Sequence, residues 1–154
     1  MFRIIKWLIA LPLGAFIFFN AYVYGNIITY RAVAPNKTAF MAMRMRQFQN
    51  EGKDVALDYR WVPYDRISVN LKKALIASED AKFAEHGGFD WGGIQYAIKR
   101  NKQSGEVKAG GSTISQQLAK NLFLNESRSY VRKGEEAAIT AMMEAVTDKD
   151  RIFE

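Results

Sequence analysis

An uncharged stretch of 24 residues, from Trp7 to Tyr30, constrains this chain more than any other feature. About 20 apolar residues are enough to cross the hydrocarbon core of a bilayer. Trp7 opens the stretch and tyrosines gather toward its other end, as in membrane-interface anchors. A cleaved signal peptide has a shorter apolar region, and Pro35 directly after the small residues 32–34 disfavours cleavage there. We therefore expect an uncleaved, single-pass membrane anchor.

The charges around this stretch do not decide its orientation. Two basic residues precede it and four follow it closely, so a plain positive-inside count would place the N-terminus outside. However, long domains are translocated largely regardless of charge, and a short head before a long exported domain is a common arrangement. Both orientations stay open on the residues alone.

Composition excludes several classes of site. The 154 residues contain no cysteine and a single histidine, His86. A disulfide framework, cysteine-ligated zinc, a thiol nucleophile and a histidine-rich metal site are therefore excluded. The length predicts one domain, and the 49% share of hydrophobic residues excludes a disordered chain.

The positive charge is local. The net charge is +6, and residues 31–73 carry nine basic and four acidic side chains. Such a segment beside a membrane anchor is either a solvated face or a surface attracted to anionic lipid head groups. We expect no nucleic-acid partner, because the basic residues form no continuous stripe and the chain is anchored.

Residues 31–154 read mostly as helices. Hydrophobic spacing and glycine breaks predict helices over about Ser68–Ala84, Trp91–Lys102, Thr113–Leu124 and Arg132–Val146. The one short β-like candidate is residues 58–62, which Pro63 stops.

Glu79 falls within an apolar stripe of the first of these helices. Leu71, Leu75, Glu79 and Phe83 are spaced four apart and would share one face. Burial there would raise the pKa of the Glu79 carboxyl and suit it to general-base chemistry. The alternative is that Glu79 pairs with a cation or reaches water. His86 likewise has a purely structural alternative, a helix-end histidine that satisfies a carbonyl.

The glycine-rich start of the third helix is a more specific signal. Thr113 and Gln116 fit a capping box. We expect the buried face to comprise Ile114, Leu118, Ala119, Leu122 and Phe123. The opposite face would carry Thr113, Gln116, Gln117, Lys120 and Asn121. Hydroxyl and amide groups with one cation at a helix N-terminus suit phosphate or sugar hydroxyls, although an ordinary capped helix has the same pattern.

The fourth helix carries an apolar side marked by Ile139, Met143 and Val146. Glu136 lies one turn before Ile139 and borders that side. Arg132 stands four residues before Glu136, at the spacing of a helical ion pair.

Three motifs in this order resemble the peptidoglycan glycosyltransferases (glycosyltransferase family 51). Residues 79–88 match EDxxFxxHxG, residues 110–121 match GxSTxxQQxxKN, and residues 132–136 match RKxxE. The segment PNKTAFM at 35–41 is similar to the juxtamembrane region of the monofunctional, biosynthetic members. Three long motifs with matching order and spacing are far more specific than any one of them.

The resemblance implies a mainly α, lysozyme-like fold with two lobes around a cleft, behind one transmembrane helix. Family members polymerise lipid II into β-1,4-linked glycan at the outer face of the bacterial inner membrane and release undecaprenyl diphosphate. The N-terminus would be cytoplasmic and the domain periplasmic. The chain would then divide into a head (1–6), an anchor (7–30), a basic juxtamembrane segment (31–66) and the N-terminal part of the glycosyltransferase domain (67–154). Partners would be lipid II, the lipid-linked glycan and the inner membrane, and the sequence does not identify any cell wall synthesis protein.

The matched positions carry roles implied by the family. Glu79 would be the general base on the acceptor hydroxyl, and Glu136 the second essential glutamate, near the donor diphosphate. The other matched positions would bind substrate: Asp80, Phe83, His86, Ser112, Thr113, Gln116, Gln117, Lys120, Asn121, Arg132 and Lys133. A divalent cation, Mg²⁺ or Mn²⁺, often accompanies the diphosphate in this family, but no clear carboxylate cluster in the sequence supports one.

The chain departs from the family at its last residues. A fourth family motif, KxxILExYLN, is matched only as far as Glu154, with Phe153 where leucine is usual. From this we expect a truncated domain in which Ile139, Met143 and Val146 lie uncovered, and no lipid II turnover by the 154 residues alone. Two alternatives remain: a lysozyme-like hydrolase, and a non-catalytic membrane protein that binds lipid-linked sugar diphosphates.

Overall fold

The computed structural model describes residues 2–106 and 109–154, and in these ranges it is helical without a strand. The mainly α fold class expected from the sequence is confirmed. Residues 58–62, the β-like candidate, are extended but unpaired. The elements are α1 (Phe2–Tyr30), α2 (Ala39–Asn50), the 3₁₀ turn η1 (Tyr64–Arg66), α3 (Val69–Glu79), α4 (Trp91–Ser104), α5 (Ile114–Phe123), α6 (Tyr130–Val146) and α7 (Lys149–Phe153).

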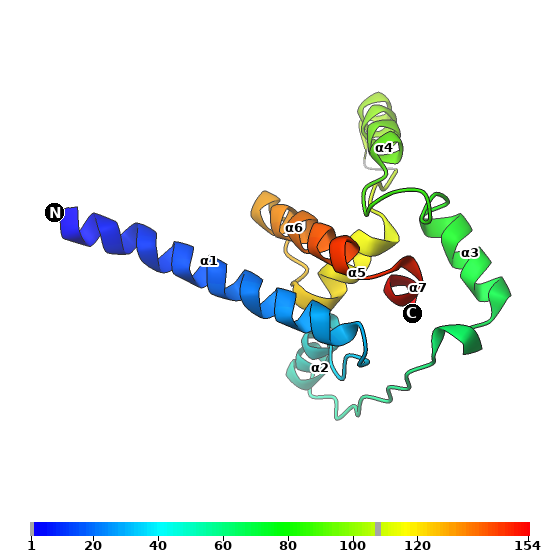
Figure 1. Cartoon of the computed structure of the whole chain (residues 1–154), viewed down its shortest axis with the longest axis horizontal. Coiled ribbons are helices and arrows are strands. Elements are labelled where there is room, and N and C mark those ends of the chain that lie inside the picture. The colour runs from blue at the N-terminus through cyan, green and yellow to red at the C-terminus, as the bar shows by residue number, and fades with distance from the viewer. Residues whose placement is uncertain (1, 107–108) are drawn as a thin grey trace.

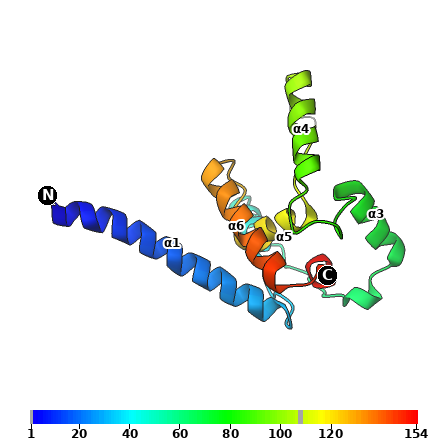
Figure 2. The same ribbon diagram turned by 45° about the horizontal axis from the view of Figure 1, so that its top comes forward.

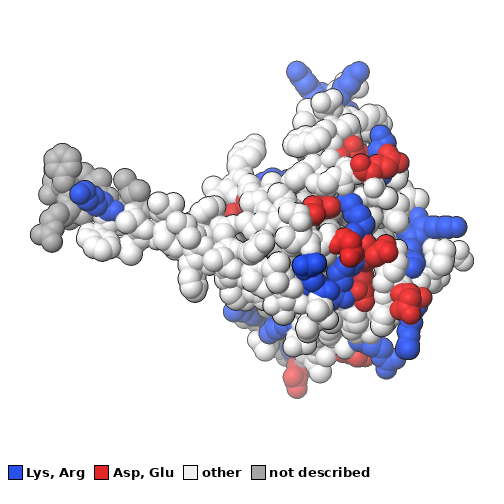
Figure 3. Space-filling model, in the orientation of Figure 1, with Lys and Arg blue, Asp and Glu red and all other residues white. Residues whose placement is uncertain are grey.

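Helix α1 has two parts with different surroundings. Its first part projects away from the rest of the chain, and its last part lies against α6 (Figures 1 and 2). Within α1, residues Lys6–Tyr30 are long and apolar enough to cross a membrane, and no other described helix is. Figure 3 shows a surface almost without charge along this projection. Val23 and Ile27, near the end of α1, are 0% and 3% exposed and belong to the core of the folded domain.

The core forms where α1, α5, α6 and α7 meet. Its fully or nearly buried side chains include Ala119 of α5, Ile139 and Met143 of α6, and Ile152 of α7. The expectation that Ile139 and Met143 would lie uncovered is wrong, because α5 and the end of α1 pack against α6, and Ile152 of α7 belongs to the same buried cluster. Val146 is partly buried against the same cluster.

Helix α2 was not anticipated from the sequence. Thr38 caps it by accepting a hydrogen bond from the Met41 N–H at 3.1 Å, and α2 packs against α5. Helix α2 is poorly amphipathic, because arginine and glutamine interrupt its apolar residues. The sequence therefore shows no clear helical spacing of hydrophobic residues in this segment.

The remaining helices frame the site. Helix α3 ends at Glu79, five residues earlier than expected, and α4 stands out from the body (Figures 1 and 2). Gly105 ends α4 with a φ of 70°, a conformation that favours glycine. The two later helices match their expected ranges to within two residues.

The burial of Ile139 leads to a stability prediction. Ile139→Ala should lower the free energy of unfolding by roughly 2–5 kcal/mol, because the side chain is 1% exposed among packed neighbours. Ile98→Ala on α4, where the side chain is 63% exposed, should change it by less than about 0.5 kcal/mol. Thermal or denaturant unfolding in detergent micelles measures both. Equal effects of the two substitutions would contradict the packing described.

Candidate functional site

The buried carboxylate of Asp80 joins the turn after α3 to the start of α5. The His86 Nε2 lies 2.9 Å from Asp80 Oδ1, and the Ile114 backbone N–H donates to Oδ2 at 3.1 Å. The Gly88 N–H donates to His86 Nδ1 at 3.1 Å, so the ring proton lies on Nε2 and faces Asp80. Asp80 therefore accepts from both the imidazole and a helix N-terminus. This also explains why α3 stops at Glu79, since the Asp80 backbone leaves the helix to aim its side chain at α5.

Thr113 makes the second link between the same two segments. Its hydroxyl donates to the Gly88 carbonyl at 2.7 Å and accepts from the Gln116 N–H at 3.2 Å. The Gln116 side-chain oxygen accepts from the Thr113 N–H at 3.0 Å, which completes the capping box expected from the sequence. Thr113 and Gln116 are only 2% and 4% exposed, so the prediction of an open polar face is wrong at these two positions. The two motifs form one hydrogen-bonded unit.

Gly88 brings this unit against α6. Its φ is 88°, and a Cβ added there would lie 2.7 Å from the Thr140 Cγ2 and 2.9 Å from the Glu144 Cγ. Only glycine combines that backbone conformation with such a close approach.

Glu79 lies at the exposed end of α3. The Gln117 amide Nε2 donates to Glu79 Oε2 at 2.9 Å and so ties α3 to α5. The expected burial of Glu79 in an apolar stripe is wrong: the carboxylate is exposed, and Leu71 and Leu75 are 60% and 40% exposed. The stripe fails because the helix ends before Phe83, which turns into the core instead and is 3% exposed.

Glu136 holds two cations on α6. It is 3% exposed, accepts from the Arg132 Nη1 at 2.6 Å and pairs with Lys133. The Arg132–Glu136 pair expected from the four-residue spacing is confirmed. The Lys133 Nζ also reaches the Ser112 hydroxyl at 3.3 Å, in the glycine-rich segment before α5.

A hollow of about 250 Å³ adjoins these cations between α4 and the start of α5. Ser112, Gln116 and Lys133 line one wall, and Ile94, Ala97 and Ile98 line the other. Further along α5, Lys120 and Asn121 are partly exposed, and neither side chain has a hydrogen-bonding or ionic partner among residues 2–106 and 109–154. A wall with hydroxyl, amide and ammonium groups can bind a polar, negatively charged ligand.

Sequence reasoning missed one cluster. Glu144 of α6 accepts from the Ser115 hydroxyl and from the Lys149 Nζ, the latter at 2.6 Å. The Lys149 Nζ also lies 4.5 Å from the centre of the Phe83 ring. No spacing in the sequence links positions so far apart, and only Lys149, in the partly matched last motif, carried a signal.

Metal ligands do not gather in the described part of the chain, where no three His, Asp or Glu side chains come together. The carboxylates of the site are instead bonded to nitrogen donors: Asp80 to His86 and Ile114, and Glu136 to Arg132 and Lys133. These side chains do not fit a protein-built Mg²⁺ or Mn²⁺ cage.

Comparison with known proteins shows strong similarity. Residues 44–154 match the family described as Transglycosylase. The chain is 88% identical over all 154 residues to a "Biosynthetic peptidoglycan transglycosylase" of Neisseria meningitidis serogroup C (strain 053442). It is 86% identical over the same residues to a protein of that description from Neisseria gonorrhoeae (strain NCCP11945). The chain spans 66% of the length of each of these curated relatives.

Gly88 provides a test of the site's geometry. Gly88→Ala should destabilise the fold by roughly 1–3 kcal/mol, because it adds a left-handed backbone penalty to a close contact with Thr140. Gly87→Ala is the matched control, since nothing lies within 4 Å of its added Cβ. The melting temperatures of both variants provide the measurement. An undisturbed Gly88→Ala would show that this turn does not pack on α6 as described.

Proposed function

This chain belongs to the transglycosylase family, and we propose on that premise that it polymerises lipid II into β-1,4-linked glycan strands and releases undecaprenyl diphosphate. The observation that carries the proposal is the union of the three motifs in one site. Glu79, the helix start at Thr113 and the Arg132–Glu136 pair lie on α3, α5 and α6. The Gln117–Glu79 hydrogen bond joins α3 to α5, and the Ser115–Glu144 hydrogen bond joins α5 to α6. The family's lysozyme-like helical fold agrees with the described residues, whose regular elements are all helical.

Glu79 is proposed as the general base. In the reaction, the 4-hydroxyl of the acceptor sugar attacks the anomeric carbon of the donor, the bond to the diphosphate breaks, and the hydroxyl proton must leave. The Glu79 carboxylate is exposed and accepts a hydrogen bond from the Gln117 amide at one oxygen. Its other oxygen is free to accept the proton of the hydroxyl. The exposure of Glu79 thus supports access by substrate, although it removes the desolvation expected from the sequence.

Arg132, Lys133 and Lys120 are proposed to offset the charge that develops on the departing diphosphate, since electrostatic stabilisation is commonly the largest catalytic contribution. Glu136 acts through two of these cations: its buried carboxylate fixes Arg132 and Lys133 at the start of α6. That arrangement supports a donor-side role for Glu136 and gives it no direct access to solvent.

The other substrate positions divide into two groups. Ser112, Gln117, Lys120 and Asn121 present side chains at or near the surface and are proposed to bind sugars and phosphates directly. The remaining side chains are mostly buried and pack or form hydrogen bonds within the protein, so they are proposed to position the first four: Asp80, Phe83, His86, Thr113 and Gln116.

We place the protein in the bacterial inner membrane, with α1 as the anchor, the N-terminus in the cytoplasm and the domain in the periplasm. The length and apolar surface of α1 support the anchor. The orientation follows from the substrate, because lipid II is polymerised at the outer face of that membrane.

A polymerisation assay tests the function and Glu79 together. The host protein is residues 1–154, alone and continued with the C-terminal third of the Neisseria meningitidis relative. Glycan polymer from lipid II is the expected product of the continued chain, glycan breakdown would indicate a hydrolase, and binding without either would indicate a carrier. Glu79→Gln should lower turnover about 10²–10⁴-fold, the usual worth of a general base, while leaving folding intact. Normal turnover in that variant would remove Glu79 from the reaction.

Glu136→Gln tests the donor side. The amide keeps the shape but cannot hold two cations, so we expect a loss of activity that exceeds any loss in the exposed control Glu126→Gln. The ratio of rates in the same assay is the measurement. Equal rates in Glu136→Gln and Glu126→Gln would show that the buried pair has no part in turnover.

A further inference from the structure

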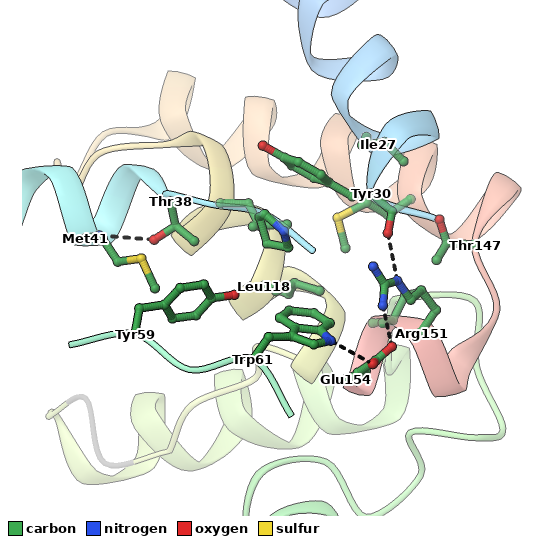
Figure 4. Close-up of a pocket in the computed structure, with 14 residues that line it drawn as sticks. Ile27, Tyr30, Thr38, Met41, Tyr59, Trp61, Leu118, Thr147, Arg151 and Glu154 are labelled. Atoms are coloured by element: carbon green, nitrogen blue, oxygen red, sulfur yellow. Dashed lines mark hydrogen bonds and ion pairs between the residues drawn. The ribbon is translucent and has the colours of Figure 1, made fainter. Parts of the chain in front are cut away.

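An apolar cavity of about 220 Å³ lies at the domain end of α1 (Figure 4). Its walls come from five helices and from the extended segment before η1. Ile27 and Tyr30 of α1 face Met41 of α2, Leu118 of α5 and the aromatic side chains of Tyr59 and Trp61. None of these residues has a role in the proposed reaction: Leu118 lies at an unspecified position of the second motif, and Met41 ends the juxtamembrane segment 35–41.

The size and lining of the cavity indicate the kind of ligand that fits. Sites for drug-sized molecules usually enclose about 300–1,000 Å³, so this cavity suits a slender segment and not a bulky one. Cavities lined by aliphatic and aromatic side chains stay dry and take apolar guests. Burial raises the pKa of the Tyr59 phenol, although nearby Arg151 opposes the shift, and so the phenol stays neutral at ordinary pH.

A polar hollow adjoins the apolar cavity and shares Thr147 and Arg151 with it. Arg31, the first residue after α1, lines this hollow. It is exposed, and its side chain has no partner in the described part of the chain. The one carboxylate of the hollow, Asp148, caps α7 by accepting from the Arg151 N–H at 2.8 Å.

Arg151 stands between the two spaces and is held in place. Its Nε donates to the Tyr30 carbonyl at 2.7 Å, its Nη1 pairs with Glu154, and its guanidinium lies 4.9 Å from the centre of the Trp61 ring. The guanidinium is therefore fixed beside an apolar cavity, with Arg31 across the adjoining hollow. The apolar cavity suits the acyl chain of an anionic lipid, and the two arginines suit its negatively charged head group.

The location of the cavity and the hollow indicates that this lipid would come from the bilayer. They lie where the apolar stretch Lys6–Tyr30 ends, which is the level of the lipid head groups if α1 crosses the bilayer. We propose that the cavity takes one acyl chain of an anionic bilayer phospholipid, with the phosphate bound between Arg31 and Arg151. The inference rests on the proposed membrane anchor and not on the transferase chemistry. The bound lipid would fix the angle between α1 and the domain by filling the space between α1, α2 and α5.

Native mass spectrometry tests the proposal without any polymerisation assay. The 154-residue chain is reconstituted into vesicles of equal phosphatidylglycerol and phosphatidylcholine, extracted in mild detergent, and the retained lipid is counted. We expect one phosphatidylglycerol per chain. Met41→Trp, which fills the cavity, should lower its retention at least tenfold, whereas Met45→Trp, one turn along α2 and outside the cavity wall, should not.

The charge requirement is tested separately. Arg31→Gln should remove the preference for phosphatidylglycerol over phosphatidylcholine, while Lys37→Gln, exposed and outside both spaces, should keep it. Should Met41→Trp fail to fold, Trp61 offers a second readout. In a Trp7→Phe, Trp91→Phe background Trp61 is the sole tryptophan, and phosphatidylglycerol brominated on its acyl chain should quench its fluorescence.

Three outcomes would overturn the proposal. One is that no lipid is retained and Trp61 is not quenched. Another is equal retention by Met41→Trp and Met45→Trp, which would assign the lipid to the surface of α1. The third is a dimer by light scattering with no lipid, which would show that a second chain covers the cavity.

Discussion

The hydrogen-bonded carboxylate of Asp80 is the interaction on which the rest of the site depends. An ionised carboxylate is costly to bury unless its oxygens are bonded, and here the His86 Nε2–H and the Ile114 N–H supply those bonds. The helix dipole favours a negative charge at the N-terminus of α5. Because Asp80 directly follows Glu79, fixing Asp80 on α5 also fixes the exposed carboxylate of Glu79 beside Gln117. One buried carboxylate thus fixes two motifs relative to each other through a bond between residues 34 positions apart, Asp80 and Ile114.

Helix α1, at the N-terminal end of the chain, also contributes to two parts of the structure. Helix α1 supplies the apolar projection in its first part and two core residues, Val23 and Ile27, in its last. Helix α1 and the domain therefore share a hydrophobic core, and α6, which carries Arg132, Lys133 and Glu136, packs against both α1 and α5.

The sequence predicted what depends on local pattern. The apolar stretch is one continuous run, and the capping box of Thr113 and Gln116 and the Arg132–Glu136 pair each join residues no more than four positions apart. The structure contains all three. The local sequence pattern could not predict contacts between residues that lie far apart in the chain. A four-residue spacing placed Glu79 in a buried stripe, but the attraction of Asp80 to the α5 N-terminus ended the helix first. The Ser115–Glu144–Lys149 cluster and the cover over Ile139 likewise arise only when separate helices meet.

The protonation of His86 tests most directly whether Asp80 joins the two motifs as described. His86 is the only histidine, so its two ring nitrogens give unambiguous ¹⁵N signals in a labelled chain. The account predicts a ring whose proton lies on Nε2, bonded to Asp80, and an unprotonated Nδ1 that accepts from the Gly88 N–H. A ring with its proton on Nδ1, or one that exchanges freely between both forms as in an exposed histidine, would contradict it.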